Sequence, residues 1–231
     1  GALQHDREFA LVDAEYRFVN AKRFPQIHRL RASYDLEHFI VTLASAQNQT
    51  EQFHLLHDKA RFEEYLSEYF GFRVFLVRNA AHGFPDDQEA SGPTMVALAT
   101  MQRLAEWFPH LDTEELLRRF RVNLIVGKTE AFWKDRLFGE DRESVRFQVG
   151  GAVFEGIKPC ARCVVPARNA RTGEQDMNFQ KIFLAKRRET LPHWTAVSRF
   201  EHFYRLSVNT YAAASEIGKV IQCGDTVKIL G

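Results

Sequence analysis

The chain has 231 residues, of which 45% are hydrophobic and 13% aromatic, so it can bury a substantial core. Its 31 Lys and Arg nearly balance its 30 Asp and Glu, which argues against any global attraction to nucleic acid or a membrane surface. Three cysteines are too few for a disulfide framework and favour a reducing, cytoplasmic compartment. We expect neither a membrane span nor a secretory signal, because no apolar run approaches the roughly 18 residues that a span needs.

The first third of the chain predicts β structure. Short runs of alternating apolar residues predict a hairpin and further strands over residues 8–13, 16–21, 27–35, 38–44, 51–57 and 72–79. One helix interrupts them at residues 59–70, where Phe62, Tyr65, Leu66 and Tyr69 have helical spacing. A loop rich in Gly, Pro and acid, residues 80–93, follows and is the best candidate for a domain boundary.

The rest of the chain mixes strands with a few helices. Helices are predicted over residues 94–108, after Asp112 as the N-cap with Glu115 at the capping-box position, and over 178–188. Strands are predicted at 122–127, in a hairpin over 145–160 that turns at Gly150–Gly151, at 163–168 and at 225–230. Because no β-α-β alternation is present, we expect an α+β, mainly β, barrel-like protein.

Three motifs do not support the functions that they first suggest. Residues 126–129, Val-Gly-Lys-Thr, lack the upstream glycine of a phosphate-binding loop, since that position is Val122. On a strand, His54 and His57 would point to opposite faces, which makes joint metal ligation awkward and favours satisfied or solvated histidines. The basic run 186–188 is interpreted as a solvated helix face.

The stretch Lys158–Glu174 holds two of the three cysteines and three arginines. Cys160 and Cys163 alone do not supply the four ligands of a structural zinc site. A redox pair needs a helix after the cysteines, and the β-branched residues that follow do not favour one. Two readings stay open: small buried hydrophobes in a strand, or a thiolate ligand in a cationic pocket with Arg162.

Several motifs, in order along the chain, resemble the MOSC domain, which is named for the C-terminal part of molybdenum cofactor sulfurase. They lie at residues 120–127, 131–139, 154–174 and 208–229, and residues 5–31 resemble the N-terminal β-barrel domain that accompanies it. The best-known relatives of this layout are the mitochondrial amidoxime-reducing components and their bacterial counterparts. The resemblance implies an N-terminal β-rich domain at 1–84, with its first strand apparently missing, and a MOSC-type β-barrel at 85–231.

The resemblance also implies a molybdenum cofactor, in which a pyranopterin holds the metal. The family's metal ligand, and hence the catalytic residue, falls on Cys163. The residues that the resemblance assigns to cofactor binding are Arg7, Ser91, Arg121, Asn123 and Arg162. One departure is Val122, where animal relatives have proline.

Three functions follow as expectations. The first is an oxidoreductase that reduces small N-hydroxylated or N-oxide substrates with electrons from a separate flavin, iron–sulfur or cytochrome protein. The second is a sulfur carrier that holds a persulfide on Cys163, a role proposed for MOSC domains, some of which accompany a pyridoxal phosphate enzyme. The third is a binding module without a cofactor. No side chain in the sequence stands out as a general acid or base.

Overall fold

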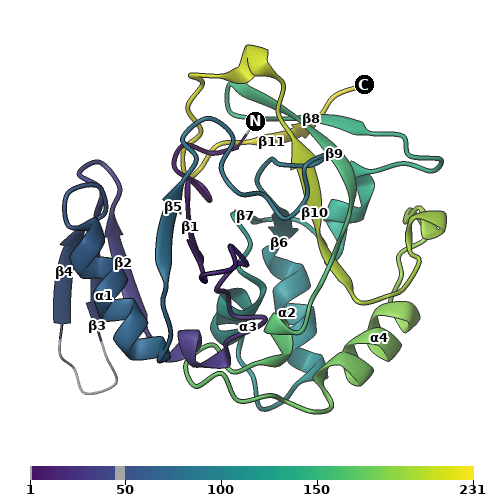
Figure 1. The fold of residues 1–231 in the computed structure, drawn as a ribbon. Coiled ribbons are helices and arrows are strands. Elements are labelled where there is room, and N and C mark those ends of the chain that lie inside the picture. The colour runs from purple at the N-terminus through teal and green to yellow at the C-terminus, as the bar shows by residue number, and fades with distance from the viewer. Residues whose placement is uncertain (1, 45–49) are drawn as a thin grey trace. The chain divides into compact units, whose positions relative to one another are not determined.

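The structure is a computed structural model that describes residues 2–44 and 50–231. It divides into two compact units, which are described separately (Figure 1). The larger unit comprises Gly1–Gln4, Pro85–Ala167 and Asp176–Gly231, and the smaller unit comprises His5–Phe84 and Arg168–Gln175. Within the described residues, no helix has both the length and the apolar character that crossing a membrane requires.

The smaller unit contains two small antiparallel sheets. One pairs β1 (Phe9–Val12) with β5 (Phe75–Arg78), and the other is a meander of β2 (Arg31–Asp35), β3 (Ile40–Ala44) and β4 (Thr50–His54). The expected hairpin partner of β1 forms only in part: residues 16–21 turn back on β1 and pair with it through one antiparallel bridge, Val12 with Phe18. The Asp13 carboxylate accepts the backbone N–H groups of Glu15 and Arg17, which holds the connection as a turn.

The predicted helix at residues 59–70 is confirmed as α1 (Lys59–Phe70). It buries Phe62, Leu66 and Phe70, and it ends at Gly71, whose φ of 77° is readily reached by glycine. The expectation that His54 and His57 point to opposite faces of a strand is wrong. β4 ends at His54 and a turn follows, so the two rings lie close together, with centroids 4.1 Å apart and planes tilted by 44°.

The larger unit is built on one six-stranded, barrel-like sheet (Figure 1). Its strands, in spatial order, are β11 (Val227–Ile229), β8 (Val145–Val149), β9 (Ala152–Ala161), β10 (Arg205–Tyr211), β6 (Met95–Ala97) and β7 (Leu124–Val126). All its pairings are antiparallel except that of β6 with β7. The expected α+β, mainly β fold with a barrel-like sheet and an N-terminal β-rich region is confirmed.

Three helices complete the larger unit: α2 (Leu98–Trp107), α3 (Thr113–Phe120) and α4 (Phe179–Glu189). They share an aromatic core in which the rings of Phe108 and Phe179 stack at 4.4 Å. The helix expected to begin at residue 94 begins at Leu98, because Met95–Ala97 form a fully buried central strand. A short apolar run of this kind does not distinguish a buried strand from a helix.

The turn at Gly150–Gly151 is confirmed, with Val149 paired to Ala152 on either side of it. Gly150 has a φ of 54°, and a Cβ there would lie 2.3 Å from the Asp225 carboxylate. The strand expected at residues 163–168 is wrong. β9 ends at Ala161, and Val165–Ala167 form a 3-10 turn, where Pro166 has no N–H to give to a sheet.

Candidate functional site

The candidate site lies where β9 ends. β10 carries a bulge between Arg205 and Val208, directly opposite Cys160 on β9. Ser207, inside this bulge, is fully buried and has a φ of 61°, a strained value for a residue with a Cβ. A bulge redirects side chains and ends regular pairing, and bulges are frequent next to functional sites.

The two cysteines of the site differ in exposure and in contacts. Cys163 is exposed and Cys160 is half-buried, and both are free thiols. Arg162 donates from Nη1 to the sulfur of Cys160 at 3.2 Å and from Nη2 to the carbonyl of Phe120 at 2.5 Å. Arg162 therefore lies at the site as expected, but the cysteine that it hydrogen-bonds is Cys160 rather than Cys163. Cys163 keeps an accessible thiol.

Arg121 directly follows the residue that holds Arg162. It caps the C-terminus of α3 with a φ of 51° and a ψ of 47°, a left-handed conformation in which glycine is the usual residue. Its side chain is exposed, and across the described part of the chain it has no ion-pair or hydrogen-bond partner. A strained backbone that presents a free cation is a reasonable indication of a ligand contact.

Asn123 fastens two strands beside the same helix end. Its side-chain oxygen accepts the backbone N–H of Thr94 at 2.9 Å and the Thr94 hydroxyl at 3.0 Å. These bonds join the starts of the parallel strands β6 and β7. The amide N–H groups of Asn123 are left to donate elsewhere.

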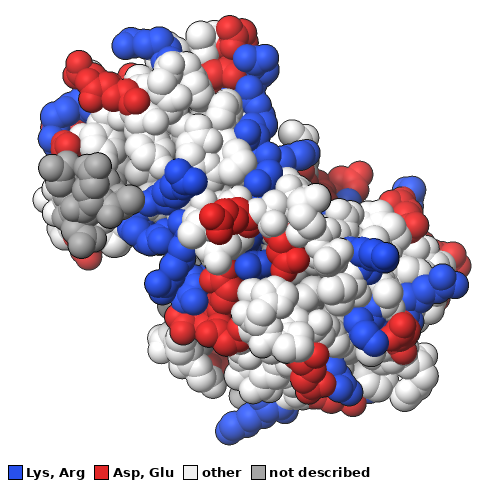
Figure 2. All heavy atoms as spheres, turned by 90° about the horizontal axis from the view of Figure 1, so that it is seen from below, with Lys and Arg blue, Asp and Glu red and all other residues white. Residues whose placement is uncertain are grey.

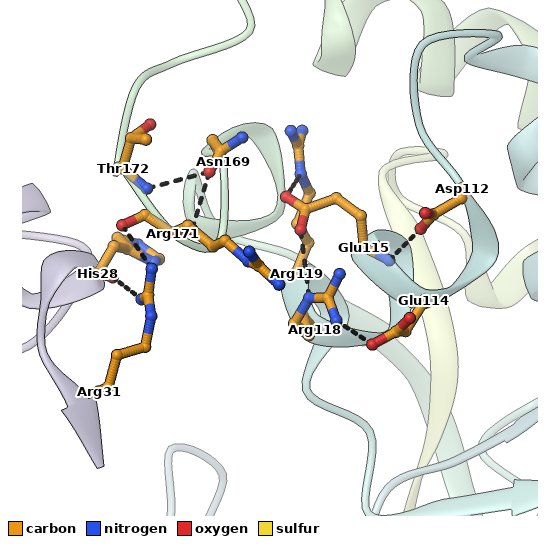
Figure 3. Close-up of polar contacts among 10 residues, drawn as sticks. All are labelled: His28, Arg31, Asp112, Glu114, Glu115, Arg118, Arg119, Asn169, Arg171 and Thr172. Atoms are coloured by element: carbon orange, nitrogen blue, oxygen red, sulfur yellow. Dashed lines mark hydrogen bonds and ion pairs between the residues drawn. The ribbon is translucent and has the colours of Figure 1, made fainter. Parts of the chain in front are cut away.

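The start of α3 is held as the sequence predicts. The Asp112 carboxylate accepts the backbone N–H of Glu115 at 2.6 Å, which is the N-cap bond (Figure 3). The Glu115 carboxylate contacts Arg118 and accepts from Arg119 Nε at 2.9 Å. Because Arg119 is 4% exposed, this pair fixes a buried cation next to the helix end that carries Arg121.

Ser91 lies in the loop before β6, and that loop is anchored to the sheet. Lys158 on β9 lies 2.9 Å from the Asp87 carboxylate, which also accepts from Asn209 on β10 at 3.1 Å. Burial alone would raise the pKa of Asp87, but Lys158 outweighs burial and lowers it. The charge pair therefore holds the loop that positions Ser91.

Arg7 belongs to the smaller unit, whereas Cys163 and the other four candidate binding residues belong to the larger one. The Arg7 backbone has a φ of 56°, and its guanidinium pairs with Asp6 at 2.8 Å. In the same unit, the segment 168–175 forms a turn in which Asn169 accepts the backbone N–H groups of Arg171 and Thr172 (Figure 3). The arginines of this segment thus belong to the unit of Arg7.

A buried ionic cluster in the larger unit was not predicted from the sequence. Asp135 contacts both Lys134 and Arg187, and it accepts the Thr195 hydroxyl at 3.1 Å. All three charged side chains are fully buried, so the interpretation of 186–188 as a solvated face is wrong for Arg187. In the sequence, this cluster is indicated only by the Lys134–Asp135 pair within the otherwise apolar start of residues 131–139.

Burial and charge set the pKa values in this cluster. Burial lowers the pKa of Lys134 to about 8, and Asp135 opposes part of that change. Burial would raise the pKa of Asp135, but Lys134 and Arg187 outweigh it and lower the value. With both cations charged, the cluster holds two positive charges against one carboxylate.

The face of the molecule drawn in Figure 2 is mixed in charge. On this face, Lys and Arg lie beside Asp and Glu over much of the area. This pattern agrees with the net charge of +1 and leaves the local arginines as the source of any anion affinity.

Two family models match the chain: the MOSC N-terminal beta barrel domain at residues 1–78 and the MOSC domain at residues 90–228. The chain therefore belongs to the MOSC domain family. A curated relative, molybdenum cofactor sulfurase from Bos taurus, is 24% identical over an alignment of 239 residues. The match covers 81% of this chain and 26% of the relative. The chain thus spans about a quarter of that relative's length.

Proposed function

We propose that this protein binds a molybdenum cofactor and reduces small N-hydroxylated or N-oxide substrates. The observation that carries the proposal is the accessible thiol of Cys163, on a segment that Arg162 joins to the end of α3. Two arginines there have no carboxylate partner within residues 2–44 and 50–231. These arginines are Arg121 and Arg162. Thiolates suit soft metal centres, and guanidinium groups suit phosphate oxygens.

The residues of the larger unit fit the donor and acceptor needs of such a cofactor. Arg121 offers an exposed guanidinium, and Asn123 offers amide N–H groups because its oxygen is already engaged by Thr94. Arg162 Nε is buried with no partner among the described residues. All three are donors, which an acceptor-rich pterin with an anionic end requires. Ser91 is proposed as a further phosphate contact, and the role of Arg7 as an anion anchor stays a prediction of the family resemblance.

When bound, the cofactor supplies a metal that exchanges two electrons. The chain contributes the sulfur ligand Cys163, and Arg162 holds the neighbouring Cys160 through its sulfur. The bulge at Ser207 and the anchored loop before β6 keep the rim of this site in one arrangement. A separate flavin, iron–sulfur or cytochrome protein would deliver the electrons, in the cytoplasm.

One observation favours a second candidate function, a sulfur carrier with a persulfide on Cys163. The curated relative is named as a molybdenum cofactor sulfurase, and an exposed thiol is the group that such a carrier needs. The substrate would then be a sulfur donor, and no metal would be required.

The test uses protein purified from a host that makes the cofactor. Reduced viologen replaces the unidentified electron donor, and a benzamidoxime-type compound serves as the substrate. The proposal predicts turnover that Cys163→Ala abolishes and Cys160→Ala largely retains. An inactive wild type that carries cyanide-labile sulfur on Cys163 would overturn the oxidoreductase and support the carrier.

A further inference from the structure

Three buried donors near Cys163 have no partner. They are Arg119 Nη1, Arg162 Nε and the Tyr204 hydroxyl, each without a hydrogen bond in the part of the chain that the structure describes. Guanidinium N–H groups only donate, and each unsatisfied buried donor costs free energy. A group of donors without acceptors indicates that something outside the chain supplies the acceptors.

The three donor side chains rest on one aromatic cluster, the rings of Phe120, Phe179 and Phe183. The Arg162 guanidinium lies 5.4 Å from the centroid of the Phe120 ring, and the Arg119 guanidinium lies 5.7 Å from that of Phe179. The Tyr204 ring meets Phe183 edge-on at 5.1 Å. Rings on these sides fix the donor groups and limit their rotation.

The backbone joins this cluster to the cysteine segment. The N–H of Arg162 donates to the carbonyl of Tyr204 at 3.0 Å, just beyond the point where β9 and β10 stop pairing. Tyr204 itself is 2% exposed. Burial raises its pKa, Arg162 and Arg119 oppose the rise, and Cys163 adds to it. The phenol therefore keeps its proton and acts as a donor at neutral pH.

The charges nearby leave room for an anion. Arg119 is paired with the Glu115 carboxylate at 2.9 Å. Arg162 donates only to neutral acceptors, a sulfur and a carbonyl. The group of Arg119, Glu115 and Arg162 thus carries one positive charge more than it has carboxylates, and that charge lies beside buried aromatic rings.

We infer that Arg119, Arg162 and Tyr204 form a subsite for a small tetrahedral oxyanion beside Cys163. The oxyanion is either free or the phosphate end of a larger ligand. Arg119 and Tyr204 lie outside the family motifs on which the proposed function depends. Arg162 is shared with the proposed cofactor site, so sulfate binding is measured on metal-free protein, where its failure is distinguishable from a failure to bind molybdenum or to turn over substrate.

The test follows sulfate binding by the metal-free protein, with sodium chloride at equal ionic strength as the reference. NMR signals of the arginine Nε–H groups report the site, and Arg162→Lys identifies the signal of Arg162. Sulfate should shift this signal saturably. Tyr204→Phe removes one donor without changing the ring, and it should weaken the affinity at least about fivefold. Arg119→Gln should weaken it similarly. Tyr211→Phe, at the exposed far end of β10, should not.

Two results would overturn the inference. One is equal sulfate affinity in the wild type and in Tyr204→Phe. The other is an unmoved Arg162 signal in protein shown by analysis to contain neither phosphate nor pterin. If sulfate binds only after a pterin has been removed, the subsite is supported and its occupant is the phosphate end of the larger ligand. Sulfate also stabilises folded proteins in general, but this effect is the same in the wild type and in the variants. Comparing the variants with the wild type therefore removes it.

Discussion

The guanidinium of Arg187 on α4 contacts the carboxylate of Asp135, and both side chains are completely buried. Lys134 contacts the same carboxylate from the neighbouring position. This ionic cluster therefore connects α4 to the 3-10 helix Trp133–Leu137, which packs against β9.

Removing the shared carboxylate should destabilise the fold strongly. Asp135→Asn leaves two buried cations without an anion, and we expect the free energy of unfolding to fall by about 3–5 kcal/mol. Urea denaturation measures this directly. Arg103→Ala, which breaks the exposed pair with Glu106, is the matched control and should hardly change the midpoint. A loss in Asp135→Asn as small as that of the control would contradict the structural role of the cluster.

Stability should rise with pH in the mildly alkaline range because of Lys134. Its pKa is about 8 in the folded protein and near the ordinary 10.5 in the unfolded chain. Between these values the unfolded chain binds more protons, so raising the pH favours the folded state. The opposite change, from the raised pKa of Tyr204, begins only near the ordinary tyrosine value of 10.0.

Urea midpoints at several pH values between 8 and 10 provide the measurement for Lys134. Lys134→Met keeps the pair of Asp135 and Arg187 and removes the titrating amine. We expect the rise with pH to be largely absent in this variant. The same rise in both proteins would assign it to other groups.

Arg121 should show a conflict between stability and binding. Arg121→Gly relieves the left-handed backbone at the end of α3, so the free energy of unfolding should not fall, and could increase by up to about 1 kcal/mol. The same variant should retain less molybdenum, since the exposed cation is gone. Arg121→Lys is the control that keeps the charge and the backbone strain. Full cofactor content in Arg121→Gly would remove Arg121 from the site.

Local signals in the sequence predicted much of the fold. α1 follows from its apolar spacing and the glycine at its end, and the β8–β9 turn follows from paired glycines. The segment 163–168 does not follow, because β-branched residues favour a strand while Pro166 and the end of the β9–β10 pairing prevent one. Propensity is local, whereas pairing depends on a partner strand far along the chain.

The motifs of the sequence predicted the residues of the candidate site. They did not predict the buried residues that surround it. Cys163 and Arg162 stood out because they share a short, cysteine-containing segment. Arg187 looked like part of a solvated basic run, because its acidic partner lies 52 residues away. Tyr204 gave no signal, since an unsatisfied buried hydroxyl is a property of packing.

The central claim is that Cys163 holds molybdenum in this chain. The most direct measurement is the molybdenum and pterin content of the wild type, Cys163→Ala and Cys160→Ala, all purified from a host that makes the cofactor. The account predicts near-stoichiometric molybdenum in the wild type and in Cys160→Ala, and its loss in Cys163→Ala. No molybdenum in the wild type, or equal amounts in all three proteins, would contradict it.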